Sequence, residues 1–242
     1  MQTPKVSKGI QLIIFDKDGT LINQHKCFGP WIEKIVNHLC AQPLSDKVFH
    51  SLGYNHIDKR FTDDSIVMCG TYEIIRKHLE TYVDPQRVDE CWEDICHNAE
   101  DIETCCNLHE LFEELTKTHN IRIAMCTNDI RKPTIETLQV LGIDKYFSYV
   151  ACADDPNVES KPSGEPLLKI CEELKIAPSN TMMVGDTISD TTAGYEALCG
   201  KVVSVGNNQA PKYSDIHFPN VIHILQLLKD MKDMKDMKDM KD

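Results

Sequence analysis

The sequence LIIFDKDGTL, at residues 12–21, ends an apolar run on two carboxylates, Asp16 and Asp18, that are one residue apart. Alternation along an extended chain puts both on the same side, where like charges repel unless a cation lies between them. A hard divalent cation such as Mg²⁺ prefers a few carboxylate oxygens together with water and substrate phosphate. Because D-G-T is also favourable turn chemistry, this stretch alone leaves a catalytic and a purely structural interpretation open.

Polar residues also follow two later apolar runs. The run ending AMCTND supplies Thr127 and Asn128, whose short donors can bind a phosphate oxygen, and the run ending MVGDTISD supplies Asp186 and Asp190. Lys161 lies between them, on the proline-stiffened loop SKPSGEP. Each residue has an ordinary explanation by itself, as a turn former, a helix-start acid or an exposed lysine. Since all of them lie at strand ends, we expect them to form one site.

The elements that must position these residues are short strands separated by helices. The candidate strands are residues 10–15, 121–126, 149–152, 181–185 and 201–206, and helical patterns cover 132–141, 166–174 and 190–199. Strands that alternate with helices predict an α/β fold, a Rossmann-like doubly wound parallel sheet covered on both faces. Ligands bind at the carboxyl ends of the strands in such sheets.

One connection is too long for a simple crossover. Thr20 and Thr127 are 107 positions apart, whereas a crossover needs about a dozen residues. Helical spacing over 28–40, 65–83 and 85–102 predicts an inserted helical domain, while the helix expected over 108–118 leads into the next strand. The expected domains are a core of residues 1–21 and 105–228, a helical domain of 22–104 and a tail of 229–242. The MKD repeat of the tail either extends the preceding helix or is frayed, and we assign it no function.

The composition excludes several classes of protein. The chain of 242 residues has 26 Lys and Arg against 38 Asp and Glu, a net charge of −12, which disfavours binding to nucleic acid or to anionic membranes. No apolar run approaches the roughly 20 residues of a membrane span, and no segment resembles a signal peptide, so we expect a soluble, cytoplasmic protein. The eleven cysteines predict reduced, mostly buried thiols, because an odd number argues against a disulfide framework. The group between Cys91 and His109 lacks the CxxC pairs of common zinc sites.

The polar residues, taken in order, resemble the motifs of the haloacid dehalogenase (HAD) superfamily. Motif I, DxDx[TV], is similar to residues 16–20; motif II is similar to Thr127; motif III to Lys161; and the acidic motif IV to residues 185–190, GDTISD. The similarity covers residues about 8–22 and 105–225, and the inserted helices resemble the C1-type cap of that family. FDKDGTL, Trp31 and Gly70-Thr71 further resemble phosphoglycolate-phosphatase-like members.

The resemblance implies a role for each matching residue. Asp16 would be the nucleophile that forms an aspartyl-phosphate, and Asp18 would protonate the leaving alcohol and then activate water. Mg²⁺ would be held by the Asp16 carboxylate, the Asp18 main-chain carbonyl and Asp186, with Asp190 as a further ligand or behind them. The expected phosphate-binding residues are Gly19, Thr20, Thr127, Asn128 and Lys161. Lys17 is expected to point away from the phosphate.

Asp18 also favours one reaction over others. Dehalogenases of this superfamily lack a carboxylate there because a halide needs no proton, and P-type ATPases have threonine. The implied activity is that of a Mg²⁺-dependent phosphatase, a phosphoric monoester hydrolase acting on a small phosphorylated metabolite, phosphoglycolate or a similar anion. A phosphomutase using the same residues, or a non-catalytic binding protein of this fold, remains an alternative. The oligomeric state is unknown.

The substrate is the least readable property. His56, Lys59 and Arg60, in GYNHIDKRF, are cations of the inserted domain that can reach a substrate carboxylate or second phosphate. Exposed loop charges are the competing interpretation. We take Arg60 as the best candidate.

Overall fold

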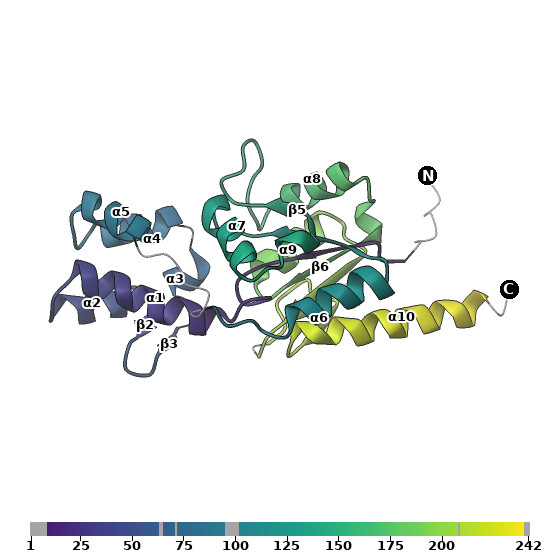
Figure 1. Cartoon of the computed structure of the whole chain (residues 1–242), viewed down its shortest axis with the longest axis horizontal. Helices are drawn as coiled ribbons and strands as arrows, with labels where there is room; N and C mark the ends of the chain where they lie inside the picture. The colour runs from purple at the N-terminus through teal and green to yellow at the C-terminus, as the bar shows by residue number, and fades with distance from the viewer. Residues whose placement is uncertain (1–8, 63–64, 71, 95–101, 208, 240–242) are drawn as a thin grey trace. The chain divides into compact units, whose positions relative to one another are not determined.

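The computed structural model describes residues 9–62, 65–70, 72–94, 102–207 and 209–239 (Figure 1). The chain divides into two compact units. One unit joins Met1–Leu21 to Thr104–Asp242, and the other is Ile22–Glu103.

The first unit is built on a six-stranded parallel sheet in the order β5-β4-β1-β6-β7-β8. Its strands are β1 (Leu12–Phe15), β4 (Arg122–Cys126), β5 (Phe147–Ala151), β6 (Thr181–Gly185), β7 (Lys201–Val205) and β8 (Ile216–Phe218). The predicted α/β fold with a parallel sheet is therefore confirmed. Strand β8 was not predicted, because three residues at the sheet edge are too few to show a strand period.

The order of the strands makes β1 the point where the direction of winding reverses. Phe15 of β1 pairs with Met125 of β4 on one side and with Val184 of β6 on the other. The chain proceeds from β1 to β4 and β5 on one side, and then returns to β6 on the other. Ligands of open α/β sheets bind at such a switch point, so the carboxyl ends of β1, β4 and β6 are where a site is expected.

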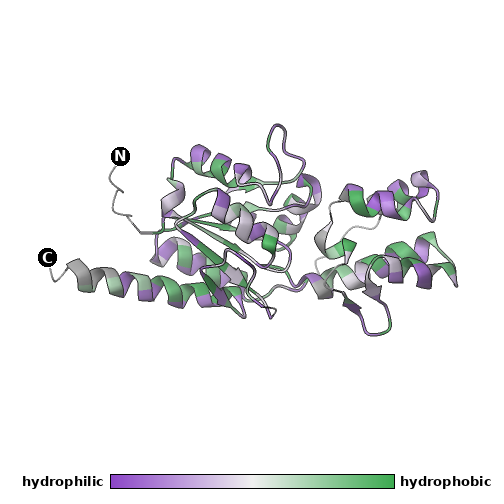
Figure 2. Cartoon of the chain, turned by 180° about the vertical axis from the view of Figure 1, so that it is seen from behind, coloured by the Kyte–Doolittle hydropathy of each residue, from purple (hydrophilic) through white to green (hydrophobic). Residues whose placement is uncertain are grey.

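Helices cover both faces of the sheet. Leu12 and Ile14 pack in one cluster with Leu167 and Ile170 of α8 (Glu165–Leu174) and with Ala193 of α9 (Ile188–Glu196). On the other face, the ring of Phe15 lies 5.7 Å from that of Phe112 in α6 (Leu108–Glu113), and Figures 1 and 2 show α10 (Ile224–Asp239) beside α6. Figure 2 colours the central strands hydrophobic and many outward helix turns hydrophilic. The sheet is thus buried on both faces, as its apolar strands require.

The remaining helices of this unit are short, apart from α7 (Arg131–Val140), which follows β4. Helix α6 continues as a π-helix over Glu114–Thr118, and single 3₁₀ turns occupy Asp144–Tyr146, Pro178–Asn180 and Val221–His223. Helix α10 runs through the MKD repeat as far as Asp239. Of the two alternatives for the tail, the structure has the continued helix.

The second unit has its own apolar core. Its elements are α1 (Gln24–Leu39), α2 (Leu44–Ser51), β2 (Tyr54–Asn55), β3 (Arg60–Phe61), α3 (Ile66–Cys69), α4 (Tyr72–Leu79) and α5 (Pro85–Asp94). Trp31, Ile32 and Ile35 of α1 are buried in one cluster with Leu79 and Val88. The helix α2 and the two-stranded antiparallel ribbon β2-β3 were not predicted.

The predicted continuous helix over 65–83 is wrong. Helix α3 ends at Cys69, and Gly70 is extended, with ψ 162°. A Cβ at Gly70 would lie 2.4 Å from the carbonyl oxygen of Ile66, so the chain can turn here only with glycine. The helix predicted over 85–102 is described as far as Asp94, and 95–101 lie outside the described residues.

Four of the cysteines that were predicted to be buried are free thiols. Cys40, Cys126, Cys152 and Cys171 are buried, as predicted for core residues, whereas the side chain of Cys69 is outside the described set. Burial raises the pKa of the Cys126 thiol to about 12, so it stays protonated at neutral pH. In the part of the chain that the structure describes, no helix combines the length and apolar character needed to cross a membrane.

Candidate active site

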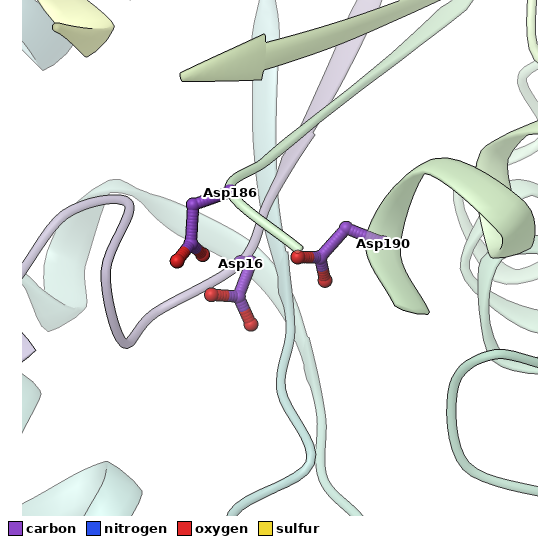
Figure 3. A group of neighbouring side chains, drawn as sticks. All are labelled: Asp16, Asp186 and Asp190. Atoms are coloured by element: carbon purple, nitrogen blue, oxygen red, sulfur yellow. The ribbon is translucent and has the colours of Figure 1, made fainter. Parts of the chain in front are cut away.

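Three carboxylates meet at the carboxyl ends of β1 and β6. Asp16 follows β1, and its backbone N–H donates to the Val184 carbonyl oxygen of β6 at 2.9 Å. Asp186 follows β6, and Asp190 lies in the first turn of α9. One ligand atom from each of the three lies within 4.8 Å of the others, and Figure 3 shows Asp186 and Asp190 directed toward Asp16.

Lys161 provides a positive charge between two of these carboxylates. Its Nζ donates to Oδ1 of Asp16 and to Oδ1 of Asp190, both at 2.6 Å, and its side chain is only 2% exposed. Its main-chain carbonyl accepts from Nδ2 of Asn128 at 2.9 Å, which ties its loop to the end of β4. The alternative of an exposed surface lysine is therefore excluded.

The start of α9 holds Asp190 in place. The Thr187 N–H and hydroxyl donate to Oδ2 of Asp190 at 2.9 and 2.6 Å, as part of a capping box. A Cβ at Gly185 would lie 2.3 Å from the Cβ of Asp190, so only glycine lets the helix begin this close to the strand. With one oxygen on Thr187 and the other on Lys161, Asp190 is placed to position Lys161.

The loop that follows Asp18 wraps the carboxylate of Asp186. The Thr20 hydroxyl donates to Oδ1 of Asp186 at 3.2 Å. Gly19 has a φ of +86°, and a Cβ there would lie 2.1 Å from Oδ2 of Asp186. Glycine is therefore required at this position both by its backbone conformation and by the close approach of the carboxylate.

This group of oxygens fits a small divalent cation. Asp16 and Asp186 each have one oxygen that accepts no hydrogen bond from the described residues, and these are the oxygen ligands that Mg²⁺ prefers. Asp190 is near them, but both of its oxygens are engaged. Asp18 was predicted as a metal ligand through its main-chain carbonyl, and its carboxylate lies outside the group. Its main-chain carbonyl stays the predicted ligand atom.

Burial and mutual repulsion raise the pKa values of two carboxyl groups in this group. Burial raises the pKa of Asp16 to about 7; Lys161 counteracts this, while Asp190 and Asp18 add to it. Burial and the same neighbouring carboxylates raise the pKa of Asp186 well above its usual range. Burial alone lowers the pKa of Lys161, but Asp16 and Asp190 together raise it, so the ammonium stays charged. Added positive charge would therefore favour the ionised forms of Asp16 and Asp186.

A pH dependence of stability follows from the Asp16 carboxyl. In EDTA, we expect the Asp16→Asn protein to be more stable than the wild type at pH 8, by a margin that shrinks toward pH 4. The folded pKa, about 7, lies above the ordinary value of 3.8, so the wild type loses stability as the pH rises through this window. Urea unfolding at several pH values measures the margin.

The control for this experiment is Asp154→Asn, which removes an exposed carboxylate that accepts from the Arg131 N–H. Its effect on stability should not follow the same pH window. A margin for Asp16→Asn that is the same at pH 4 and pH 8 would contradict the expectation.

Lys17 and Asp129 belong to the site, although the sequence did not predict a role for either side chain. The Nζ of Lys17 lies 2.6 Å from Oδ2 of Asp129 and 3.1 Å from Oδ2 of Asp18, and the side chain is 5% exposed. Burial raises the pKa of Asp18, and Lys17 partly offsets this. Asp129 directly follows the predicted Thr127-Asn128 pair. Its place at the same strand end was the available signal.

The other predicted residues differ in their placement. Thr127 is buried at the end of β4, where its hydroxyl accepts from the Asp129 N–H at 3.1 Å. Nδ2 of Asn128 is used to hold the Lys161 carbonyl, and its buried Oδ1 has no partner among the described residues. Arg60 is exposed on β3 of the second unit.

Comparison with known proteins relates this site to hydrolases. Residues 10–197 match the model of the haloacid dehalogenase-like hydrolase family. A pyrophosphatase of Halalkalibacterium halodurans is 28% identical over 202 residues, covering 78% of this chain and 80% of that protein. A phosphoglycolate phosphatase of Aquifex aeolicus is 26% identical over 197 residues, covering 78% and 81%.

A solved structure shares the fold. A HAD-superfamily hydrolase of subfamily IA from Geobacter sulfurreducens superposes with a TM-score of 0.64 at 21% identity, covering 92% of this chain and all of that one. At this level of identity the likeness concerns the fold.

Proposed function

Because the chain belongs to the haloacid dehalogenase-like hydrolase family, we propose that this enzyme is a Mg²⁺-dependent phosphatase of small phosphomonoesters that works through an aspartyl-phosphate. One observation carries the proposal. Asp16 lies with one oxygen on Lys161 and the other free, next to Asp186 and two residues before Asp18. This arrangement supports a nucleophilic role for Asp16 beside the Lys161 ammonium, with Asp18 as the carboxylate for proton transfer.

In the first step, one carboxylate oxygen of Asp16 forms a bond to phosphorus while the bond from phosphorus to the leaving oxygen breaks. Asp18, protonated at this stage, donates its proton to that oxygen, and the alcohol departs. Lys161 places positive charge beside the transferring phosphoryl oxygens.

In the second step, water attacks the aspartyl-phosphate, and Asp18 takes the proton of the attacking water. The bond between phosphorus and the Asp16 oxygen breaks, which releases phosphate and restores both carboxyl groups. A protonatable group at residue 18 serves both steps, and this supports hydrolysis of an ester rather than displacement of a halide.

Asp16 and Asp186 would hold Mg²⁺ together with the main-chain carbonyl of Asp18, and Asp190 would act behind them through Lys161. When bound, the ion supplies positive charge to the phosphoryl oxygens and neutralises the carboxylates. Thr127 and the loop at Gly19 and Thr20 would complete the phosphate site.

The two units would divide the work. We assign the sheet-containing unit the chemistry and the helical unit, Ile22–Glu103, the role of a cap that selects the substrate. The relatives are named for pyrophosphate and for phosphoglycolate, and both molecules carry a second anionic group beside the phosphoryl group. This favours a small substrate with two anionic groups.

A screen of phosphate release tests the proposed function. The purified protein is assayed with Mg²⁺ and with EDTA on a panel that contains pyrophosphate, phosphoglycolate, sugar phosphates and 4-nitrophenyl phosphate. We expect Mg²⁺-dependent release with at least one of these compounds. Transfer of the phosphoryl group within a sugar phosphate without release would indicate a mutase. Absence of turnover over the whole panel would favour a non-catalytic protein.

Arg60 provides a prediction about the substrate. We expect Arg60→Ala to raise KM about tenfold for a substrate with a second anionic group, the size of one lost charge-assisted contact. The value of kcat should change little. Steady-state kinetics on the best substrate of the screen measure both constants. The matched control is Lys77→Ala, another exposed cation of the same unit. Equal KM values for the two variants and the wild type would dispose of this role for Arg60.

A further inference from the structure

Lys17 and Asp129 form a buried ion pair that contacts the carboxylate of Asp18. We propose that Asp129 is a positioning residue of the reaction: Asp129 holds the ammonium of Lys17, and Lys17 holds one oxygen of Asp18, so that the other oxygen carries the transferred proton. This inference rests on the proposed function of Asp18 as general acid and base. It extends that function to a residue 111 positions away in the sequence.

Asp129 is itself held in place. Its Oδ1 accepts from the N–H of Ile130 at 2.8 Å, and its own N–H donates to the Thr127 hydroxyl at 3.1 Å. Its main-chain carbonyl accepts from the Ala153 N–H at 3.0 Å. Only Oδ2 is left for Lys17, which it meets at 2.6 Å. The end of β4 thus presents one carboxylate oxygen to the loop after β1.

Lys17 transmits this placement to Asp18. A lysine side chain that is 5% exposed needs partners for its charge, because burial of an unpaired ammonium is costly. Its partners are Oδ2 of Asp129 at 2.6 Å and Oδ2 of Asp18 at 3.1 Å. Burial lowers the pKa of Lys17, but Asp18 and Asp129 raise it more, so it lies above its ordinary range. The ammonium therefore stays charged and donates to both carboxylates.

The consequence for Asp18 is a choice between its two oxygens. Oδ2 faces an ammonium, whereas Oδ1 accepts no hydrogen bond from the described residues. A proton to be delivered to a leaving group therefore belongs on Oδ1. Without the ion pair, the side chain of Asp18 can rotate, and misplacement of a catalytic group by about 1 Å can cost about 10²-fold in rate.

A pair of substrates that differ only in the leaving group tests the positioning role. Phenyl phosphate needs a proton on its leaving oxygen much more than 4-nitrophenyl phosphate does. We measure kcat/KM, because it includes every step up to the departure of the leaving group. For Asp129→Ala we expect a loss of about 30-fold on phenyl phosphate and of about threefold on 4-nitrophenyl phosphate, since general-acid catalysis matters mainly for the poor leaving group. Asp129→Asn keeps the shape of the side chain, so its loss of kcat/KM on phenyl phosphate should be smaller than that of Asp129→Ala.

Two controls keep the result readable. Asp154→Asn removes a carboxylate from the same end of the sheet without touching Lys17, and both substrates should be hydrolysed as by the wild type. If Asp129 acts through Lys17, the double variant Lys17→Met/Asp129→Ala should lose no more on phenyl phosphate than Lys17→Met alone. Circular dichroism checks that each variant is folded. If Asp129→Ala does not fold, the isosteric variant Asp129→Asn takes its place in the test.

The outcomes separate this inference from the proposed function. If the wild type is active and the Asp129 variants lose the same factor in kcat/KM on both substrates, the positioning role is overturned. It is also overturned if the losses of Lys17→Met and Asp129→Ala multiply in the double variant. A wild type without Mg²⁺-dependent turnover overturns the proposed function and this inference with it.

Discussion

The Asp16→Asn protein is expected to release phosphate at least about 10⁴-fold more slowly than the wild type, because an amide cannot form the bond to phosphorus that starts the reaction. The substitution changes little else. Asparagine keeps the shape of aspartate and an oxygen that can accept from Lys161, which still has Asp190 as a partner. The free energy of unfolding should therefore not fall, whereas the activity should.

The measurement is Mg²⁺-dependent phosphate release on the best substrate of the screen. Acid quenching and mass spectrometry of the protein should find one added phosphoryl group on the peptide that contains Asp16 in the wild type, and none in Asp16→Asn. Asp154→Asn is the control for removal of a carboxylate near the strand ends. An Asp16→Asn protein within about tenfold of the wild type would be incompatible with a nucleophile at this position.

The Lys161→Met protein is expected to lose about 3–5 kcal/mol of unfolding free energy in EDTA at pH 8, the usual cost of removing one partner of a buried ion pair. Lys161 is 2% exposed and contacts Asp16 and Asp190 at 2.6 Å each. Methionine fills the same space without the charge, so two buried carboxylates are left facing one another. The loss should grow as the pH rises, because Lys161 is what counteracts the raised pKa of Asp16.

Urea unfolding in EDTA measures this effect, and a repeat in Mg²⁺ should recover part of the loss, since a bound cation stabilises the folded state. The control is Lys169→Met in α8, which removes a partly exposed lysine paired with Glu173 and should have no measurable effect. A Lys161→Met protein as stable as this control would show that the buried contacts contribute nothing. Loss of turnover is expected as well, because Lys161 lies against the nucleophile.

The parallel sheet could be predicted from the sequence because its signals are local. Strands β1, β4 and β6 hold runs of buried apolar residues, and a polar residue follows each of them directly, at Asp16, Thr127 and Asp186. These runs have a physical cause: both faces of a parallel sheet are buried. Elements without such a pattern were missed, among them α2 and the ribbon β2-β3, whose strands have two residues each.

The helical unit was predicted less well, because the ends of its elements lack a local sequence pattern. Its apolar spacing indicated helices but not where they end, and the break between α3 and α4 depends on a contact. Gly70 is extended, and in this conformation a side chain would collide with the carbonyl oxygen of Ile66, so the residue must be glycine. A glycine in a helical pattern is compatible with a continued helix, so the period alone could not show the break.

For the candidate site, too, the residue types could be predicted from the sequence, whereas their contacts could not. By itself, the sequence determined which residue types stand at the strand ends and in the loops and turns that follow them: Asp16, Asp18, Thr127, Lys161 and the acidic pair of GDTISD. It did so because strand ends and turn residues are encoded over a few neighbouring positions.

Only the tertiary structure decided how these groups are paired. Asp190 turned out to be engaged through both oxygens, by Lys161 and Thr187, while Lys17 was found buried between Asp18 and Asp129. Lys17 and Asp129 are 112 positions apart in the chain, and Lys161 and Asp190 are 29 positions apart. Which carboxylate meets which ammonium depends on the order of strands in the sheet, and no local pattern of the sequence encodes that order.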